Sequence, residues 1–228
     1  MGIQSESTTR TLVGLTAALA IGASVSACSR VPGVYTYVPA GQEKSAGPGG
    51  ATAFDAKTYV NGIWDSKVLP TVQKDAVAAT ELLPALEANQ AAASKKYGNQ
   101  AGTGSPYAFL VKGTGTVTGL DAEAPTHPLT VKVDGLNGKT ANVQIVTGPV
   151  IAGTALRDAV KFITFGNFTN QLNYADAATE LNTRVKSEVL AKVKAKDLVG
   201  KKVTFAGAFS LVAPGVVLVV PTQLEAAS

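Results

Sequence analysis

The sequence is poor in the residues on which most metal and nucleophilic sites depend. Its 228 residues include one cysteine and one histidine. A single cysteine excludes an intramolecular disulfide framework and zinc sites that need two or four cysteines. A single histidine excludes the zinc signature HExxH, which needs two. We therefore expect no metal and no other cofactor.

Aromatic residues and charge are also scarce. Aromatic residues make up 6% of the chain, too few for a stacking platform that binds single-stranded nucleic acid. The net charge of +4 is too small to identify an anionic partner, and no nucleic acid is expected. No apolar run reaches the roughly 18 residues of a membrane span. With 46% hydrophobic and 16% charged residues, the chain is still that of a folded protein of one or two domains.

The N-terminus has the pattern of a targeting segment. Thr11 to Val25 is uncharged and mostly apolar, which suits the hydrophobic region of a signal peptide and is too short for a bilayer span. The small residues before Cys28 resemble a bacterial lipobox, whose cysteine receives acyl chains such as palmitate and whose leader is cleaved before it. We predict a signal peptide over 1–27 and lipidation at Cys28. The alternative is an ordinary signal peptide that happens to contain a cysteine.

Residues 28–53 are rich in Gly, Pro, Ser and Ala. Such a composition buries too little apolar surface to offset the entropy lost on ordering. We predict a flexible tether that links the lipid anchor to a folded body.

Residues 54–105 have helical periodicity and predict a small helical domain of two or three helices. Asp55 is suited to cap the first helix, and Pro70 predicts its end. A second amphipathic stretch is kinked or restarted at Pro84 and ends at Gly98. The apolar stripe of the first helix consists of Val60, Ile63, Trp64 and Val68.

From residue 106 to 228 the pattern changes to strands. Gly113 and Gly115 would let the first strand curl, and Asn137-Gly138 indicates a hairpin between the second and third. The predicted strands cover 107–120, 129–134, 143–145, 202–209 and 216–221.

Two helices are predicted between the third and fourth strands, a short one over 154–160 and a long one over 173–194. The predicted order is three strands, a helical insertion and two further strands. This is the element order of an OB-like, five-stranded Greek-key barrel. We predict an α+β protein with an N-terminal helical domain and an OB-like α/β domain. A split α+β sandwich is the competing fold.

Several runs, in this order, resemble a bacterial family of predicted periplasmic lipoproteins of unknown function. The resemblance implies a helical domain joined to an OB-like domain. It also implies an accessory role beside an ABC-type sugar transport system, because genes of the family often adjoin sugar transport operons. It assigns no catalytic residue. The runs are FDAKTYVNGIWDSKVLP (54–70), VKGTGTVTGL (111–120), TVKVDGLNGKTANVQI (130–145), GPVIAGTALRDAVKFITFGNFTNQ (148–171) and YADAATELN (174–182).

The segment GPVIAGTALRD (148–158) is the candidate ligand site. Thr154 would cap a helix start, where backbone N–H groups are free. Arg157 falls in the first turn, where a cation opposes the helix dipole by about 0.3–1 kcal/mol. An anionic ligand bound by Thr154, Arg157 and Asp158 would offset this cost. The interpretation that we favour is an internal ion pair of Arg157 with Asp158 or with a carboxylate of the N-terminal helical domain.

Other motifs are weaker. The glycines of VKGTGTVTG (111–119) have the wrong spacing and setting for a dinucleotide loop. His127 is interpreted as a solvated loop residue, and the basic stretch 184–202 as a solvated helix face or, less favoured, a contact with anionic lipid. No nucleophile elbow or carboxylate dyad is recognisable.

These observations predict a lipid-anchored protein of the cell envelope, facing the periplasm or the cell exterior, that is not an enzyme. We interpret it as a binding or accessory module, associated with sugar uptake. One alternative is an envelope hydrolase. Another is oligosaccharide or oligonucleotide binding on the OB-like face, where the exposed residues would include Lys132, Lys139, Asn142 and Gln144.

Overall fold

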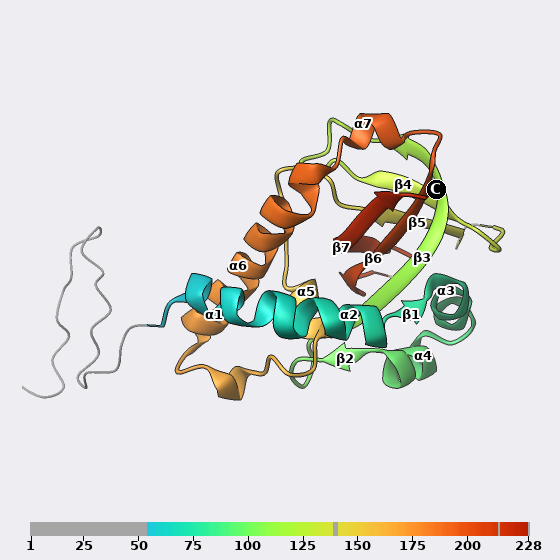
Figure 1. Ribbon diagram of the computed structural model, residues 1–228. Coiled ribbons are helices and arrows are strands. Elements are labelled where there is room, and N and C mark those ends of the chain that lie inside the picture. The colour runs from blue at the N-terminus through green and yellow to red at the C-terminus, as the bar shows by residue number, and fades with distance from the viewer. Residues whose placement is uncertain (1–53, 139–140, 214, 228) are drawn as a thin grey trace, which may run out of the picture. The chain divides into compact units, whose positions relative to one another are not determined.

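The computed structural model describes residues 54–138, 141–213 and 215–227 (Figure 1). The predicted signal peptide, the tether and the lipidation residue Cys28 lie outside the described residues.

The first helix runs further than the sequence predicts. The carboxylate of Asp55 accepts hydrogen bonds from the N–H groups of Lys57 and Thr58 at 3.3 and 3.1 Å, which starts α1 (Ala56–Ile63) as expected. The chain then passes through the π-helical turn η2 (Trp64–Val68) into α2 (Leu69–Asp75), so the predicted end at Pro70 is wrong.

The π-helical turn is the reason that the chain continues through Pro70. The N–H of Leu69 bonds to the carbonyl of Trp64, five residues back, instead of to a carbonyl four back. This wider turn interrupts the regular ladder next to Pro70, which has no N–H to donate. Pro70 consequently lies in the first turn of α2, the part of a helix that tolerates proline.

The rest of the N-terminal segment is folded onto β3 (Tyr107–Leu120), the first strand of the barrel. Pro84 lies inside α3 (Ala79–Ala88), and α4 (Gln90–Tyr97) ends before Gly98 as predicted. Two short strands flank these helices, and both pair with β3. They are β1 (Val77–Ala78), which is parallel to β3, and β2 (Asn99–Gln100), which is antiparallel to it.

The remaining strands close into the predicted OB-type barrel. Its order is β3-β4-β5-β7-β6, and β6 pairs back onto β3. Only the β5–β7 pair within this ring is parallel. The strands that follow β3 are β4 (Leu129–Val133), β5 (Asn142–Ile145), β6 (Lys202–Ser210) and β7 (Leu218–Ala226).

The last strand differs from the prediction of 216–221. It begins at Leu218 and continues to Ala226, because residues 223–226 pair with 203–206 of β6. Pro221 ends the apolar run, and Thr222 and Gln223 after it are polar, so the pairing with β6 identifies the rest as strand.

The glycines of β3 allow the strand to curl, as predicted. A Cβ atom on Gly115 would lie 2.3 Å from the carbonyl oxygen of Lys132 in the next strand. A Cβ atom on Gly113 would lie 2.9 Å from the ring of Phe205. Both positions therefore need a residue without a side chain.

The helical insertion between β5 and β6 also departs from the prediction. The long helix α6 (Gln171–Glu188) ends six residues before the predicted end at Lys194. Val193 leaves the stripe formed by Leu181 and Val185 and packs with the barrel cluster instead. The shorter elements are α5 (Ala155–Ala159), η4 (Phe165–Asn167), η5 (Leu190–Lys192) and α7 (Ala195–Leu198).

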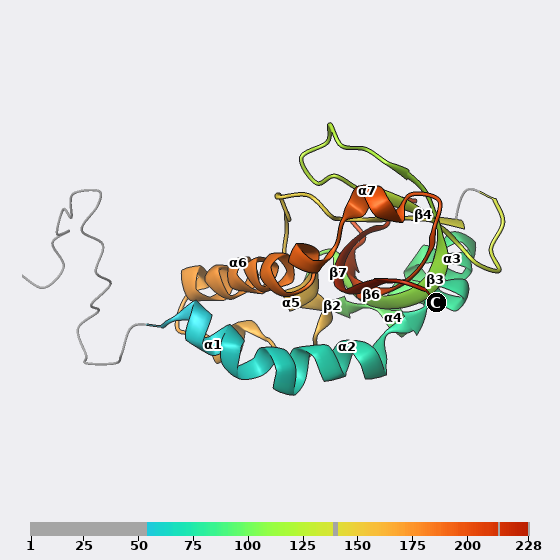
Figure 2. The ribbon, with the colours of Figure 1, turned by 45° about the horizontal axis from the view of Figure 1, so that its top comes forward.

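Two apolar clusters hold these elements together. One fills the barrel, where the rings of Phe109 and Phe209 stack with centroids 5.0 Å apart. The other joins the α1–α2 run to α5, α6 and the strands, with Trp64 and Leu181 among its buried members. Figure 2 shows α1 beside α6. Helices before residue 98 contribute to both clusters, and the predicted division at residue 105 stays a prediction.

Candidate functional site

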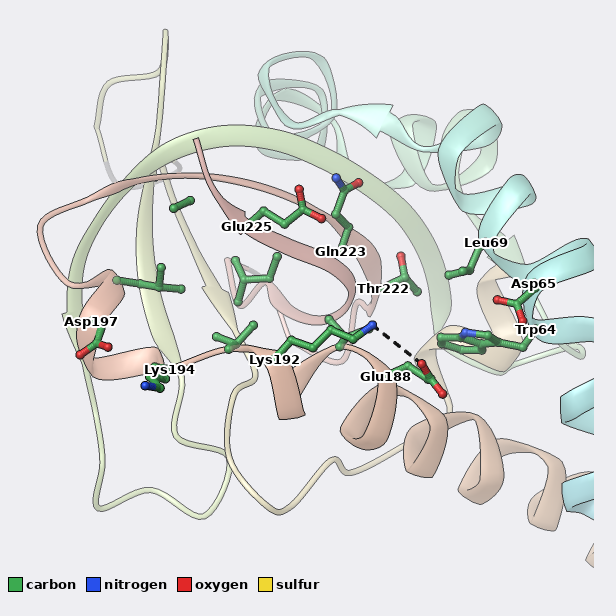
Figure 3. A pocket seen from close by; sticks show the side chains of 15 residues that line it. Trp64, Asp65, Leu69, Glu188, Lys192, Lys194, Asp197, Thr222, Gln223 and Glu225 are labelled. Atoms are coloured by element: carbon green, nitrogen blue, oxygen red, sulfur yellow. Dashed lines mark ion pairs between the residues drawn. The ribbon is translucent and has the colours of Figure 1, made fainter. Parts of the chain in front are cut away.

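A cleft of about 590 Å³ opens between the C-terminal end of α6, the turn η2 and the last residues of β7 (Figure 3). Its lining comes from three parts of the sequence that are far apart. The π-helical turn places Trp64 and Asp65 on one wall, and residues 188–198 form another. The strand β7 supplies Thr222–Ala226, the part that the sequence did not predict as strand.

Polar groups of different kinds share this cleft. Thr222, Gln223 and Glu225 supply a hydroxyl, an amide and a carboxylate. The ammonium group of Lys192 pairs with the carboxylate of Glu188 at 3.9 Å, as Figure 3 shows. Glu188 also pairs with Arg184 at 3.8 Å, so its charge is shared between two cations.

Apolar side chains complete the lining. Trp64 is 2% exposed and is the only tryptophan of the chain. Leu69, Val189 and Leu198 add aliphatic surface beside it. The volume lies within the range of small-molecule sites, and the walls combine apolar side chains with a few polar groups.

The structure brings the predicted residues Thr154, Arg157 and Asp158 together, away from this cleft. The guanidinium of Arg157 donates to Asp158 Oδ1 through Nε at 2.7 Å and lies 2.7 Å from it through Nη2. The Thr154 hydroxyl donates to Asp158 Oδ2 at 2.5 Å, so it does not cap α5 as predicted. Asp158 is one of the two partners predicted for Arg157 in an internal ion pair.

Tyr174 of α6 covers this ion pair. Its carbonyl accepts from Arg157 Nη1 at 3.1 Å, and its ring lies 3.6 Å from the guanidinium carbon. Burial raises the pKa of the Tyr174 hydroxyl, with further effects of opposite sign from Arg157 and Asp158. Arg157 and Asp158 are 8% and 9% exposed. Because Arg157 of α5 also bonds to Tyr174 of α6, the buried pair joins the two helices. Binding of an anionic ligand by these residues stays a prediction.

The remaining candidates lie elsewhere. His127 adopts a positive φ of 39° in the loop before β4, and the glycines of residues 111–119 lie within β3. Lys132 and Asn142 are exposed and pair across β4 and β5, with Gln144 on the same face, whereas Lys139 lies outside the described residues.

The described ranges hold neither a metal-binding cluster nor a membrane-spanning helix. No three histidine, cysteine, aspartate or glutamate side chains among these residues are placed to hold a metal ion. None of the helices in this part of the chain has the length and apolar character to cross a membrane.

The sequence did not point to the cleft. Its β7 residues lie beyond the predicted end of the last strand, and its residues 189–193 lie within the predicted long helix. Trp64 was predicted as a core residue, which it is, and only the fold shows that it also faces the cleft.

Comparison with known proteins supports the fold. An OB-fold protein from Thermotoga maritima superposes on the chain with a TM-score of 0.65 and 23% sequence identity. The match covers 77% of this chain and 100% of that protein. No curated protein matches the chain.

A family match identifies the chain more closely. Residues 18–225 match the family described as "Predicted periplasmic lipoprotein (DUF2291)". This description confirms the predicted resemblance and the predicted location of a lipid-anchored protein at the cell envelope. Because the match includes nearly the whole chain, the protein belongs to this family of predicted periplasmic lipoproteins.

Proposed function

We propose that this protein is a non-enzymatic binding or accessory module of the cell envelope that serves a sugar uptake system. The observation that carries the proposal is the cleft between η2, α6 and β7. We further propose that the signal peptide is removed and that acyl chains on Cys28 anchor the protein to the membrane.

The lining of the cleft suits a small polyhydroxylated ligand. Sugar hydroxyl groups both donate and accept hydrogen bonds, and Thr222, Gln223 and Glu225 offer both kinds of partner. The C–H faces of a sugar pack on apolar side chains, which the half-buried Leu69 and Leu198 provide. Glu188 is engaged by Arg184 and Lys192, an arrangement that suits a positioning role better than proton transfer.

Trp64 makes the proposal directly testable. Because it is the only tryptophan and lines the cleft, the intrinsic fluorescence of the full-length protein reports on ligand entry. Titration with a panel of neutral pentoses and hexoses should give a saturable change for at least one sugar. Gln223→Ala should weaken this response, and the sugar should be recovered unchanged.

Gln144→Ala is the matched control, because this glutamine lies on the β4–β5 face and not in the cleft. It should bind the sugar like the wild type. No saturable response to any sugar would contradict sugar binding in the cleft. Conversion of the sugar to a product would contradict the non-enzymatic role and support the envelope hydrolase.

The accessory role needs a separate experiment. We expect that crosslinking of the lipidated protein in native membranes captures components of an ABC-type sugar transporter. Recovery of the protein without any transport component, under conditions that capture the contacts between subunits of such a transporter, would contradict this part of the proposal.

The OB-like face is a second candidate site, for an oligosaccharide or oligonucleotide. Lys132, Asn142 and Gln144 are exposed side by side on β4 and β5. These are the second and third strands of the barrel, where OB folds often bind such chains. Loss of oligomer binding in Gln144→Ala with retention in Gln223→Ala would favour this face over the cleft.

A further inference from the structure

The chain enters the folded body through a cluster of aromatic rings. Phe54, the first described residue, lies 5.4 Å from the ring of Phe168 and 5.7 Å from that of Tyr59. The cluster continues through Tyr174 to Phe165, with centroid separations of 5.3 and 5.8 Å. Figures 1 and 2 both show the start of α1 beside the segment that leads into α6, at the end of the folded body away from the barrel.

The chain segment that leads into α6 carries no charged side chain. Residues 162–175, FITFGNFTNQLNYA, contain no aspartate, glutamate, lysine or arginine, although charged residues make up 16% of the chain. Within this uncharged segment, Phe165 is 47% exposed and Leu172 is 74% exposed. Large apolar side chains that are exposed are costly in water and favourable at a lipid interface.

The uncharged segment also satisfies its own polar groups. Asn167 Oδ1 accepts from the backbone N–H of Thr164 at 2.8 Å, and the N–H of Asn167 donates back to the Thr164 carbonyl at 3.0 Å. Asn170 Oδ1 accepts from the N–H of Asn173 at 2.9 Å at the start of α6. Backbone groups paired in this way lose less on leaving water than free ones would.

We propose that the uncharged segment 162–175, with Phe54 beside it, rests on the membrane surface and inserts Phe165 and Leu172 at the headgroup level. Aromatic and aliphatic side chains favour this depth. The proposal rests on the lipid anchor that the family implies, because the chain from the anchor enters the body at this cluster. It does not depend on the ligand of the cleft.

The proposed contact lies at the opposite end of α6 from the cleft. Leu172 lies at the beginning of α6, and the cleft residue Glu188 lies at its end. A helix of 18 residues is about 27 Å long at about 1.5 Å per residue. The cleft consequently lies about one helix length along α6 from the proposed contact.

Spin labels placed by cysteine substitution test the contact. With Cys28 acylated, a cysteine introduced at Phe165 or Leu172 is the only free thiol. Val199→Cys is the matched control, because Val199 is 45% exposed, like Phe165, but follows α7 beyond the far end of α6. The lipidated proteins would be placed in vesicles of phosphatidylethanolamine and phosphatidylglycerol at a ratio of about 3:1, and label depth measured by power saturation with oxygen and a nickel chelate.

We expect the labels at 165 and 172 to collide several-fold more with oxygen, relative to the nickel chelate, than the label at 199. Labels at 165 and 172 as water-exposed as the one at 199, on protein that co-sediments with the vesicles, would overturn the proposal. Failure to co-sediment would instead contradict the lipid anchor. Leu172→Asp should also return the label at 165 to water, and thermal unfolding would check that this variant remains folded.

Discussion

At the scale of single residues, Arg157 and Asp158 form a buried ion pair whose side chains are 9% and 12% exposed. Arg157→Ala leaves the carboxylate buried with only hydroxyl partners, so we expect the free energy of unfolding to fall by about 3–5 kcal/mol. Urea unfolding measures this loss. The control Lys192→Ala removes a cation that is 74% exposed and should cost less than about 0.5 kcal/mol.

The same variant separates the two predictions made for Arg157. A structural ion pair predicts the loss of stability without any effect on ligands. An unchanged melting temperature, together with lost binding of a small anionic or sugar-acid ligand, would instead identify Arg157 as a ligand anchor.

Tyr174 makes stability depend on alkaline pH. Burial raises the pKa of its hydroxyl above the ordinary value of 10.0, so the folded protein retains the proton after the unfolded chain has lost it. The stability gained from the neutral hydroxyl is fully present below about pH 10 and is lost as the pH rises through the raised pKa. Urea unfolding between about pH 9 and pH 11 should show this decline, and Tyr174→Phe should show a shallower one. Equal slopes for both proteins would contradict the assignment.

At the scale of elements, the curl of β3 depends on close approach to β4. A Cβ atom on Gly115 would meet the Lys132 carbonyl at 2.3 Å and the Val131 side chain at 2.8 Å. We expect Gly115→Ala to lower the free energy of unfolding by about 1–3 kcal/mol, as overpacking does.

Gly119→Ala provides the control within the same strand, because no atom lies within 4 Å of the position that its new methyl group would take and its φ is not positive. Its unfolding free energy should stay within about 0.5 kcal/mol of the wild type. Equal losses for the two variants, measured by chemical denaturation, would contradict the assignment of the loss to the close approach of β3 and β4.

At the scale of the whole molecule, the two apolar clusters link the N-terminal helices to the barrel. Trp64 reports on the helical cluster, and far-ultraviolet circular dichroism reports on all secondary structure. Because α3 packs in the barrel cluster, we expect both signals to show one coincident unfolding transition. Two separated transitions would show that residues 54–105 and 106–228 are independent folding domains, as the sequence division alone suggests.

The location of the molecule depends on its lipid anchor. Cys28→Ser removes the thiol that would be acylated, so labelling with radioactive palmitate should disappear. The protein should then be found in the soluble fraction or as the uncleaved precursor. Normal labelling and normal partitioning into detergent would contradict lipidation at Cys28.

Local patterns in the sequence determined much of the fold. Asp55 and the apolar stripe after it identify the first helix, and the alternation in residues 107–120 and 202–209 identifies β3 and β6, which pair with each other. Asn137-Gly138 marks the hairpin between β4 and β5. These signals are local because capping, turn geometry and side-chain periodicity act over a few residues. Their order along the chain was enough to indicate the OB-type barrel.

Tertiary contacts alone decided the remaining features. The π-helical turn carries the first helix through Pro70, and pairing with β6 extends β7 to Ala226. Val193 joins the barrel cluster after α6 has ended at Glu188. The cleft depends on all three, because it forms where η2, the segment after α6 and the end of β7 meet. No local pattern encodes such a meeting, since its free energy comes from packing between residues more than a hundred positions apart in the sequence.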